Sequence, residues 1–206
     1  PAPGCGKEYV AEWRCGASPE VRRATAGAEA GFGKTVELTC AGVAAMPSPA
    51  QAVTPAATNL ALRKPATQSS IEHGGEAARA VDGNTDGNYF GANSVSHTGS
   101  RPQEWWQVDL GAVHPIQTIR LWNRTDCCAE RLSRFYVFVS ETPLPPGIQA
   151  AQQQSGVWSY YLDRAAGRTT DIPVNRNGRY VRIQLAGTNY LQLAEVEVWG
   201  RAQALP

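Results

Sequence analysis

The chain has 206 residues, 18% of them charged, and a formal net charge of +1 at pH 7. A protein that binds phosphate backbones usually carries a large basic excess or a basic stripe, so this balance argues against nucleic acid as a partner. The longest apolar runs fall far short of the ~20 residues that a membrane span needs. No charged-then-apolar signal segment opens the chain, so we expect a mature or trimmed form.

Two stretches within residues 1–46 alternate apolar and polar residues, a period of two that predicts strands. One face of the first carries Tyr9, Ala11, Trp13 and Cys15, and one face of the second carries Val36, Leu38 and Cys40. Because Cys15 and Cys40 end these strands on their apolar faces, we expect them to form a disulfide. A unit this small cannot bury a large hydrophobic core, so it would need a cross-link such as this disulfide for stability. The sequence does not indicate what this module does.

The five cysteines of this Gly- and Pro-rich chain are typical of an exported protein, so we expect it to be secreted or extracellular. Their number is odd, which leaves one thiol unpaired within the chain. If Cys127 and Cys128 bond to each other, and Cys15 bonds to Cys40, that thiol is Cys5.

Residues 47–58 are rich in Pro and Ala and carry no charge. This composition predicts a semi-extended linker, which places a domain boundary there and a second domain over residues 59–201.

From residue 59 onward, short β-like runs alternate with turn residues, and no long segment has helical periodicity. The runs are "EWWQVDLG", "IQTIRLWNR", "RFYVFVS", "GRYVRIQL" and "LAEVEVWG". Many short strands separated by Gly, Pro and Asn predict an all-β fold, an antiparallel β-sandwich or jelly roll. The strand "LAEVEV" is a natural partner for an entry strand near "NLALRK".

Four segments of this region resemble the discoidin-type β-sandwich of coagulation factors V and VIII. They are "NLALRKPATQSS", "AVDGNTDGNY", "EWWQVDLG" and "LQLAEVEVWG". A narrower resemblance, to the F-type lectin (fucolectin) family, comes from His97, then 26 residues, then Arg124-x-Asp126, then four residues, then Arg131. The adjacent Cys127 and Cys128 lie inside the same motif.

The three basic residues of the motif suit a neutral sugar. Arginine offers several donors in fixed geometry and histidine adds one directional partner, which fits the lone pairs of a ring oxygen and an axial hydroxyl. The resemblance implies that His97, Arg124 and Arg131 do this for α-L-fucose and fucosylated glycans. Asp126 is placed to hold one guanidinium, a supporting role that we infer.

A disulfide between the adjacent Cys127 and Cys128 links no distant parts of the chain, but it presents a rigid, polarizable surface beside the donors. A flexible side chain would cover the same sugar face only by losing rotamer freedom. The resemblance implies that this vicinal disulfide packs on the sugar ring. The alternative is two reduced, buried thiols next to an unrelated pair of arginines.

The missing hydroxyl at C6 of fucose calls for a methyl pocket. By the same resemblance Phe90 is its aromatic wall, Ile71 a second wall, and His73 reaches the sugar or its neighbour. The alternative is that the aromatic residue belongs to the core, where such residues are more often found.

The stretch "RAVDGNTDGN" resembles the family's calcium loop. Ca²⁺ takes six to eight oxygen ligands, and a turn rich in Asp and Asn supplies side-chain and carbonyl oxygens together. The resemblance implies a structural Ca²⁺ held by Asp82, Asn84, Glu195 and the carbonyls of Arg79, Ser94 and Ala194. The alternative is an ordinary Asx-rich turn.

The sequence has neither a spaced zinc cluster nor a nucleophile paired with a base, so we expect no enzyme. The resemblance also allows that the chain is the carbohydrate-binding part of a larger glycosidase. The rival interpretation is a discoidin-type membrane- or protein-binding adhesion module. Membrane binding needs apolar side chains at exposed loop tips, such as Trp122 or Trp158, with flanking basic residues. The sequence leaves the oligomeric state open.

Overall fold

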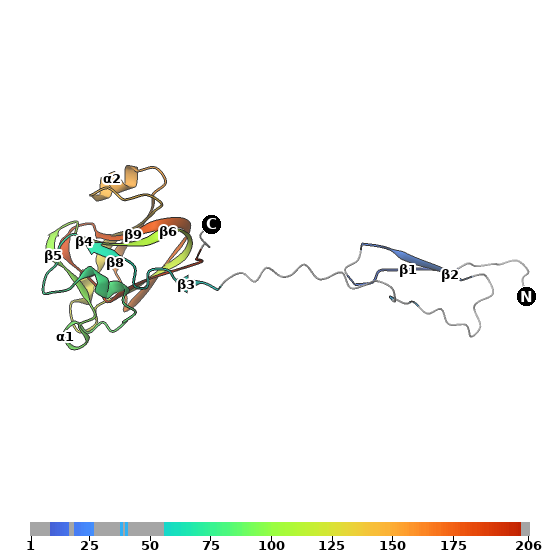
Figure 1. Ribbon diagram of the computed structural model, residues 1–206, viewed down its shortest axis with the longest axis horizontal. Coiled ribbons are helices and arrows are strands. Elements are labelled where there is room, and N and C mark those ends of the chain that lie inside the picture. Colours follow the sequence, from blue (N-terminus) through green and yellow to red (C-terminus); the bar gives the residue numbers. More distant parts are fainter. Residues whose placement is uncertain (1–8, 17–18, 27–37, 39, 41–55, 203–206) are drawn as a thin grey trace, which may run out of the picture. The chain divides into compact units, whose positions relative to one another are not determined.

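The computed structural model of the chain describes residues 9–16, 19–26, 38, 40 and 56–202. The chain divides into two compact units, Pro1–Val53 and Thr54–Pro206, and Figure 1 draws the elements of each. No helix of the described part is long and apolar enough to cross a membrane.

The first unit contains one antiparallel pair, β1 (Tyr9–Trp13) and β2 (Arg22–Ala26). A disulfide joins Cys15 to Cys40. The alternating first stretch of the sequence forms β1, whereas β2 was not predicted, because its half-buried positions are Arg22 and Ala24 and give no apolar alternation. The second expected strand, apart from residues 38 and 40, and Cys5 lie outside the described residues, as does most of the proposed linker.

The second unit is built from two antiparallel sheets, which confirms the predicted all-β class. The larger sheet has the order β3-β11-β6-β9-β7-β8, with β4 also paired to β6, and the smaller one pairs β10 with β5. Figure 1 shows α1 and α2 at opposite sides of this domain. The strands are β3 (Thr58–Asn59), β4 (Ala66–Gln68), β5 (Ser96–Pro102), β6 (Trp105–Trp122), β7 (Ser133–Ser140), β8 (Trp158–Ala165), β9 (Thr169–Leu185), β10 (Thr188–Leu193) and β11 (Glu195–Gly200). The short helices are η1 (Ala77–Val81), α1 (Tyr89–Ala92), η2 (Ala129–Arg131) and α2 (Ile148–Gln153).

The predicted strands are recovered with two differences of length, one of them in β9, which begins at Thr169, well before the run "GRYVRIQL". Two runs that we separated at "GAVHPI" form the single strand β6, because β6 and its partner β9 shift register between Asp109 and His114 and again between Ile116 and Thr118. Bulges of this kind absorb extra residues and tolerate proline, so Gly111 and Pro115 do not end the strand. The last strand, β11, pairs with β3 as well as β6, so the domain's first and last strands meet as expected.

The core lies on the inner face of the large sheet. Along β6, buried and half-buried residues alternate from Trp105 to Leu110, the period of two expected of a strand with one buried face. Trp106 and Phe135 are fully buried there, and the Trp106 indole donates to the carbonyl of Ala77 in η1 at 2.9 Å. This packing gives rigid support to the loops between the strands, on which the candidate site lies.

Candidate functional site

The loop that follows β6 carries the arginines and the cysteine pair, and Asn123 closes it. Asn123 is 2% exposed, its side-chain oxygen accepts from the Arg124 backbone N–H at 2.8 Å, and its Nδ2 donates to the Ala129 carbonyl at 2.9 Å. Cys128 then adopts the left-handed conformation, with φ of 60°, just before η2. The loop is therefore fixed at both ends before any ligand is present.

Arg124 is held by Asp126 in a two-pronged ion pair. Nε donates to Oδ1 at 2.7 Å and Nη2 donates to Oδ2 at 3.0 Å, with 4% and 14% of the two side chains exposed. These hydrogen bonds lower the pKa of Asp126 to about 2. The carboxylate thus stays charged at neutral pH and keeps the guanidinium in one orientation, the supporting role expected of Asp126.

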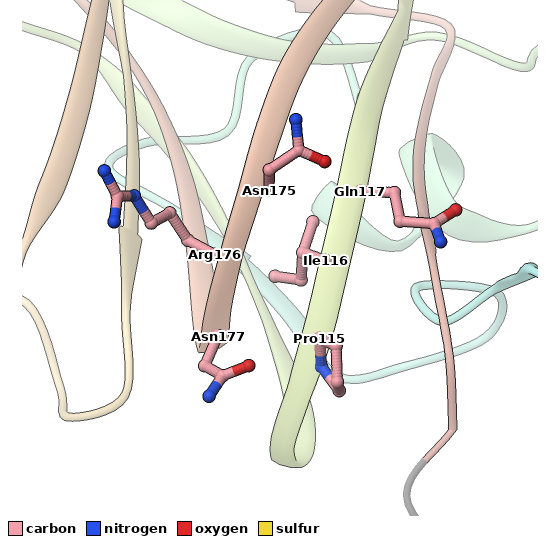
Figure 2. A pocket seen from close by; sticks show the side chains of 6 residues that line it. All are labelled: Pro115, Ile116, Gln117, Asn175, Arg176 and Asn177. Carbon is pink, nitrogen blue, oxygen red and sulfur yellow. The ribbon is translucent and has the colours of Figure 1, made fainter.

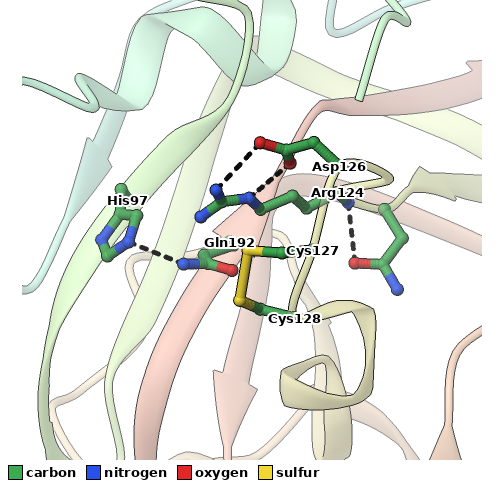
Figure 3. The surroundings of a disulfide bond; sticks show 7 residues. His97, Arg124, Asp126, Cys127, Cys128 and Gln192 are labelled. Atoms are coloured by element: carbon green, nitrogen blue, oxygen red, sulfur yellow. Dashed lines mark hydrogen bonds and ion pairs between the residues drawn. A yellow bond between two sulfur atoms is a disulfide. The ribbon is translucent and has the colours of Figure 1, made fainter. Parts of the chain in front are cut away.

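Cys127 and Cys128 form a disulfide that lies beside Arg124 (Figure 3). Cys127 is exposed and Cys128 half-buried. The sulfur pair therefore offers a surface to solvent, in contrast to the alternative of two buried thiols.

His97 lies on β5 and is 3% exposed. Its ring Nδ1 is 2.7 Å from the Thr98 carbonyl, and burial lowers its pKa, an effect to which the neighbouring His73, Arg124 and Arg131 add. The His97 backbone N–H donates to the Gly75 carbonyl at 2.9 Å. The loop around Gly75 touches β5 so closely that a Cβ on this glycine would lie 2.4 Å from the Cβ of His97.

Two aromatic side chains of α1 pack against the Arg124 guanidinium. The Arg124 guanidinium carbon lies 4.7 Å from the ring centre of Tyr89 and 5.4 Å from that of Phe90. Phe90 is 82% exposed, which sets it apart from a core aromatic. The Tyr89 hydroxyl donates to the His73 carbonyl and thereby ties α1 to the loop before η1.

These elements enclose a hollow of about 570 Å³. It is lined by His73, Tyr89, Phe90, His97, Arg124, Cys127, Cys128 and Arg131. The structure thus brings together all the expected sugar-binding residues except Ile71, which is 51% exposed and does not line the hollow. Tyr89 stands in the lining instead, and the sequence gave no reason to separate it from the adjacent Phe90.

Strand β10 lies beneath this hollow and was not predicted. Its Tyr190 ring lies 4.7 Å from the guanidinium carbon of Arg131 and 5.3 Å from the centre of the His97 ring. The next residue facing the same way, Gln192, pairs directly with His97 across the small sheet and is 1% exposed. The short run "TNYLQL", which one residue separates from β11, carries too weak an alternation to be recognised as a strand of its own.

The Asp- and Asn-rich loop after η1 forms successive turns closed by its own side chains. Asp82, Asn84 and Asp86 each accept from the backbone N–H two residues further on, at 2.7, 3.0 and 2.9 Å. Each of these is an Asx turn, which the sequence offered as the alternative to a cation site.

Glu195 distinguishes this loop from a plain turn. Its side chain is fully buried, one oxygen accepts from the Gly83 N–H at 3.2 Å, and the other has no hydrogen-bond partner in the described part of the chain. Burial raises the pKa of Glu195 to about 8. A buried carboxylate with an unused oxygen, beside the exposed Asp82 and Asn84, has the donor chemistry that a hard cation requires.

The rest of the expected ligand set supplies carbonyls. Ser94 and Ala194 are 1% and 0% exposed. No cluster of three His, Cys, Asp or Glu side chains occurs among the described residues. The residues therefore fit a cation site that uses carbonyl and amide oxygens alongside two carboxylates.

The Asx-rich loop and the arginine loop are in contact. The Thr125 N–H donates to the Gly87 carbonyl at 2.9 Å, and a Cβ on Gly87 would lie 2.5 Å from the Asn123 carbonyl oxygen. The position of one loop consequently sets the position of the other.

A second hollow, of about 390 Å³, lies over the bulged part of β6 and β9 (Figure 2). Its polar side chains from β9 are all exposed: Asn175, Arg176 and Asn177. Figure 2 shows Arg176 and Gln117 pointing in opposite directions. Because these groups do not converge on one point, this hollow lacks the features of a specific ligand site.

Comparison with known proteins gives consistent similarities. Residues 79–183 match the family of NedA-like, galactose-binding domains of F5/F8 type C. Fucolectin-5 of Anguilla japonica is 38% identical over 148 residues, which is 68% of this chain and 75% of that protein.

Two solved structures are similar as well. A Streptococcus pneumoniae fucose binding module superimposes with a TM-score of 0.62 at 32% identity, over 70% of this chain and 99% of that one. The lectin domain of lectinolysin, in complex with Lewis B antigen, superimposes with a TM-score of 0.60 at 38% identity, over 70% of this chain and 98% of that one.

Proposed function

Because the chain belongs to the fucolectin family of F5/F8 type C domains, we propose that residues 59–201 form an F-type lectin domain that binds α-L-fucose and fucosylated glycans. The observation that carries this proposal is the single hollow in which His97, Arg124 and Arg131 meet the vicinal disulfide. The similarity to a fucose binding module and to a lectin domain in complex with Lewis B antigen supports it.

The arginines act as hydrogen-bond donors. Asp126 occupies Nε and Nη2 of Arg124, and the planar guanidinium retains further N–H groups for a ligand. A neutral sugar has no charge to pair with, so these N–H groups serve the lone pairs of its ring oxygen and axial hydroxyl. The ion pair keeps Arg124 in one orientation, so little rotamer entropy is lost when the sugar binds.

The apolar contacts of the proposed site come from sulfur and from one aromatic ring. The Cys127–Cys128 disulfide packs on a face of the sugar, and Phe90 lies against the C6 methyl group. The exposure of Cys127 and of Phe90 supports this assignment, because both surfaces are open before the ligand arrives. A single sugar in an open pocket is expected to bind in the micromolar to millimolar range, with tighter apparent binding only when several sites act together.

A structural Ca²⁺ is part of the proposal. Asp82, Asn84, Glu195 and the carbonyls of Arg79, Ser94 and Ala194 would hold it. The ion would neutralise the buried carboxylate and supply the partner that its free oxygen lacks. Because Gly87 and Thr125 are hydrogen-bonded, its binding would also steady the arginine loop.

We propose a role in binding without catalysis, for a secreted or extracellular protein. Disulfides such as Cys15–Cys40 and Cys127–Cys128 persist in that environment. The structure argues against the rival role in membrane binding. Trp158 packs against the core and the indole nitrogen of Trp122 is buried, so neither is an apolar side chain at an exposed loop tip.

The proposal is tested with Arg131→Ala and Arg124→Ala on immobilised fucose and by calorimetric titration. Both variants are expected to lose binding by at least about 100-fold while the circular dichroism spectrum is kept, because each removes several donors at once. Arg120→Ala is the matched control, since Arg120 forms an exposed ion pair with Asp171. Retention of wild-type affinity in either pocket variant would refute the site, and sedimentation with anionic liposomes would favour the rival role.

A further inference from the structure

The pocket's three basic residues meet at one buried atom. Gln192 lies on β10 directly opposite His97 on β5, and its side-chain amide points at His97, Arg124 and Arg131. The amide oxygen is the chemically consistent occupant of this point, because the NH₂ group that Figure 3 draws there would face the N–H groups of both arginines. The oxygen lies 2.6 Å from Nε2 of His97, 3.2 Å from Nη1 of Arg124 and 3.0 Å from Nη1 of Arg131.

We propose that the Gln192 amide oxygen is the acceptor that positions all three basic residues for ligand binding, an inference that rests on the lectin function proposed above. Gln192 does not line the hollow and is therefore a positioning residue. It acts through the side chains that reach the sugar.

The local backbone explains how Gln192 reaches this point. Between the pairs Tyr190↔Ser100 and Gln192↔His97, β5 contains one residue more than β10, which is a bulge. The Thr98 hydroxyl accepts from the Leu191 N–H at 2.8 Å and so satisfies the backbone where the ladder is interrupted. The extra residue brings His97, and not Thr98, opposite Gln192, while Tyr190 and Gln192, two residues apart on β10, face the same side.

Charge gives the amide its importance. Arg124 has a carboxylate partner, whereas Arg131 forms no ion pair within the described residues. Two guanidinium groups and an imidazole therefore approach one another while only Arg124 is paired to a carboxylate among the described ion pairs, and the partial charge of the amide oxygen is what draws them together. A neutral acceptor orients the donors and leaves the pocket cationic, so the remaining N–H groups stay available to a neutral sugar.

The same contact fixes the histidine ring. The Thr98 carbonyl can only accept, so Nδ1 donates to it, and Nε2 donates to the Gln192 oxygen only when the ring is protonated. In the protonated ring both nitrogens have protein partners. The other groups that face His97 are the rings of His73, Tyr89 and Tyr190, with Arg124 and Arg131 behind the amide.

The test compares Gln192→Met with Gln184→Met, which removes another amide that is 1% exposed but donates to the Gln103 carbonyl. Loss of an acceptor for charged donors is expected to weaken L-fucose binding by roughly 10- to 100-fold in Gln192→Met, measured by calorimetry, and to change it less than about threefold in Gln184→Met. Wild-type affinity in Gln192→Met, or equal losses in both variants, would overturn the proposal.

A second readout does not depend on sugar binding. The His97 pKa, followed by NMR titration, is expected to be lower in Gln192→Met, which lacks the acceptor, and higher in Gln192→Glu, which supplies a carboxylate. An unchanged His97 midpoint in both variants overturns the proposal even if affinity falls. If Gln192→Met does not fold, Gln192→Glu carries the titration test. If the wild-type protein does not bind fucose, the lectin proposal fails and the titration alone decides the role of Gln192.

Discussion

Asp126→Asn tests whether the ion pair, and not the guanidinium alone, prepares the pocket. The bonds to Arg124 lower the pKa of Asp126 from 3.8 to about 2. At ~1.4 kcal/mol per unit, this shift corresponds to about 2 kcal/mol of folding free energy for a side chain as well covered as this one. Asparagine keeps the shape and one acceptor oxygen but removes the charge, so we expect Asp126→Asn to lose about 2 kcal/mol and to bind fucose about tenfold more weakly at pH 7.

The pH dependence follows from the sign of the shift. A carboxylate whose folded-state pKa is depressed stabilises the folded protein above its unfolded pKa and loses that contribution as pH falls through the folded value. The difference in unfolding free energy between wild type and Asp126→Asn should therefore be constant above about pH 5, shrink as pH falls through about 2, and disappear by about pH 1. Urea denaturation measured at intervals over this range gives the curve directly.

Asp171→Asn supplies the matched control. Asp171 receives the same two-pronged contact from Arg120, at 2.7 and 2.9 Å, but its side chain is 50% exposed and lies outside the pocket lining. An exposed pair contributes about 0–1 kcal/mol, so Asp171→Asn should change stability little and fucose affinity not at all. If Asp126→Asn bound fucose as the wild type does, or if its stability deficit did not shrink between about pH 5 and pH 2, the reasoning about Arg124 would be wrong.

Three further predictions concern other parts of the site. Gly75→Ala is expected to abolish fucose binding in a titration, because its Cβ would lie 2.4 Å from that of His97, whereas Gly187→Ala, with no atom within 4 Å, should bind normally; equal affinities would contradict this. Reducing the vicinal disulfide with dithiothreitol should weaken fucose binding without lowering the melting temperature of the lectin domain. Unchanged affinity would count against packing of the disulfide on the sugar. Chelation with EDTA should lower that melting temperature. In EDTA the protein should also lose stability as pH rises from about 5 to 8, because burial raises the pKa of Glu195 to about 8 and ionisation there opposes folding. A melting temperature that does not respond to EDTA at any pH would remove the calcium proposal.

Local sequence patterns were enough for some of the strands and for part of the pocket. The runs that alternate over five or more residues, such as those in β6 and β11, were predicted because one face of each is buried. Arg124, Asp126 and the cysteine pair lie within five residues of one another, so their spacing alone places them together.

Contacts that depend on register were not predictable in this way. Gln192 reaches His97 only because β10 pairs with β5 across 95 residues of sequence and because a bulge in β5 places His97, and not Thr98, opposite it. Ile71 was expected in the pocket, but Tyr89 occupies the wall, because the Asn88 side chain caps α1 and presents Tyr89 towards Arg124. Such outcomes depend on loop conformation, which a residue pattern does not specify.

Buried amides, and not carboxylates, hold most of this pocket in place. Asn123 closes the arginine loop, the Gln68 amide donates to the carbonyls of Ser70, Gly75 and His97, and Gln192 faces the three basic groups. An amide supplies hydrogen bonds without net charge, so it braces a cationic pocket without neutralising the donors that a sugar needs. This argument predicts that carboxylate substitutions at these positions reduce fucose affinity more than they reduce stability. A set of Gln192→Glu measurements in which both fall in proportion would show instead that the amides serve folding alone.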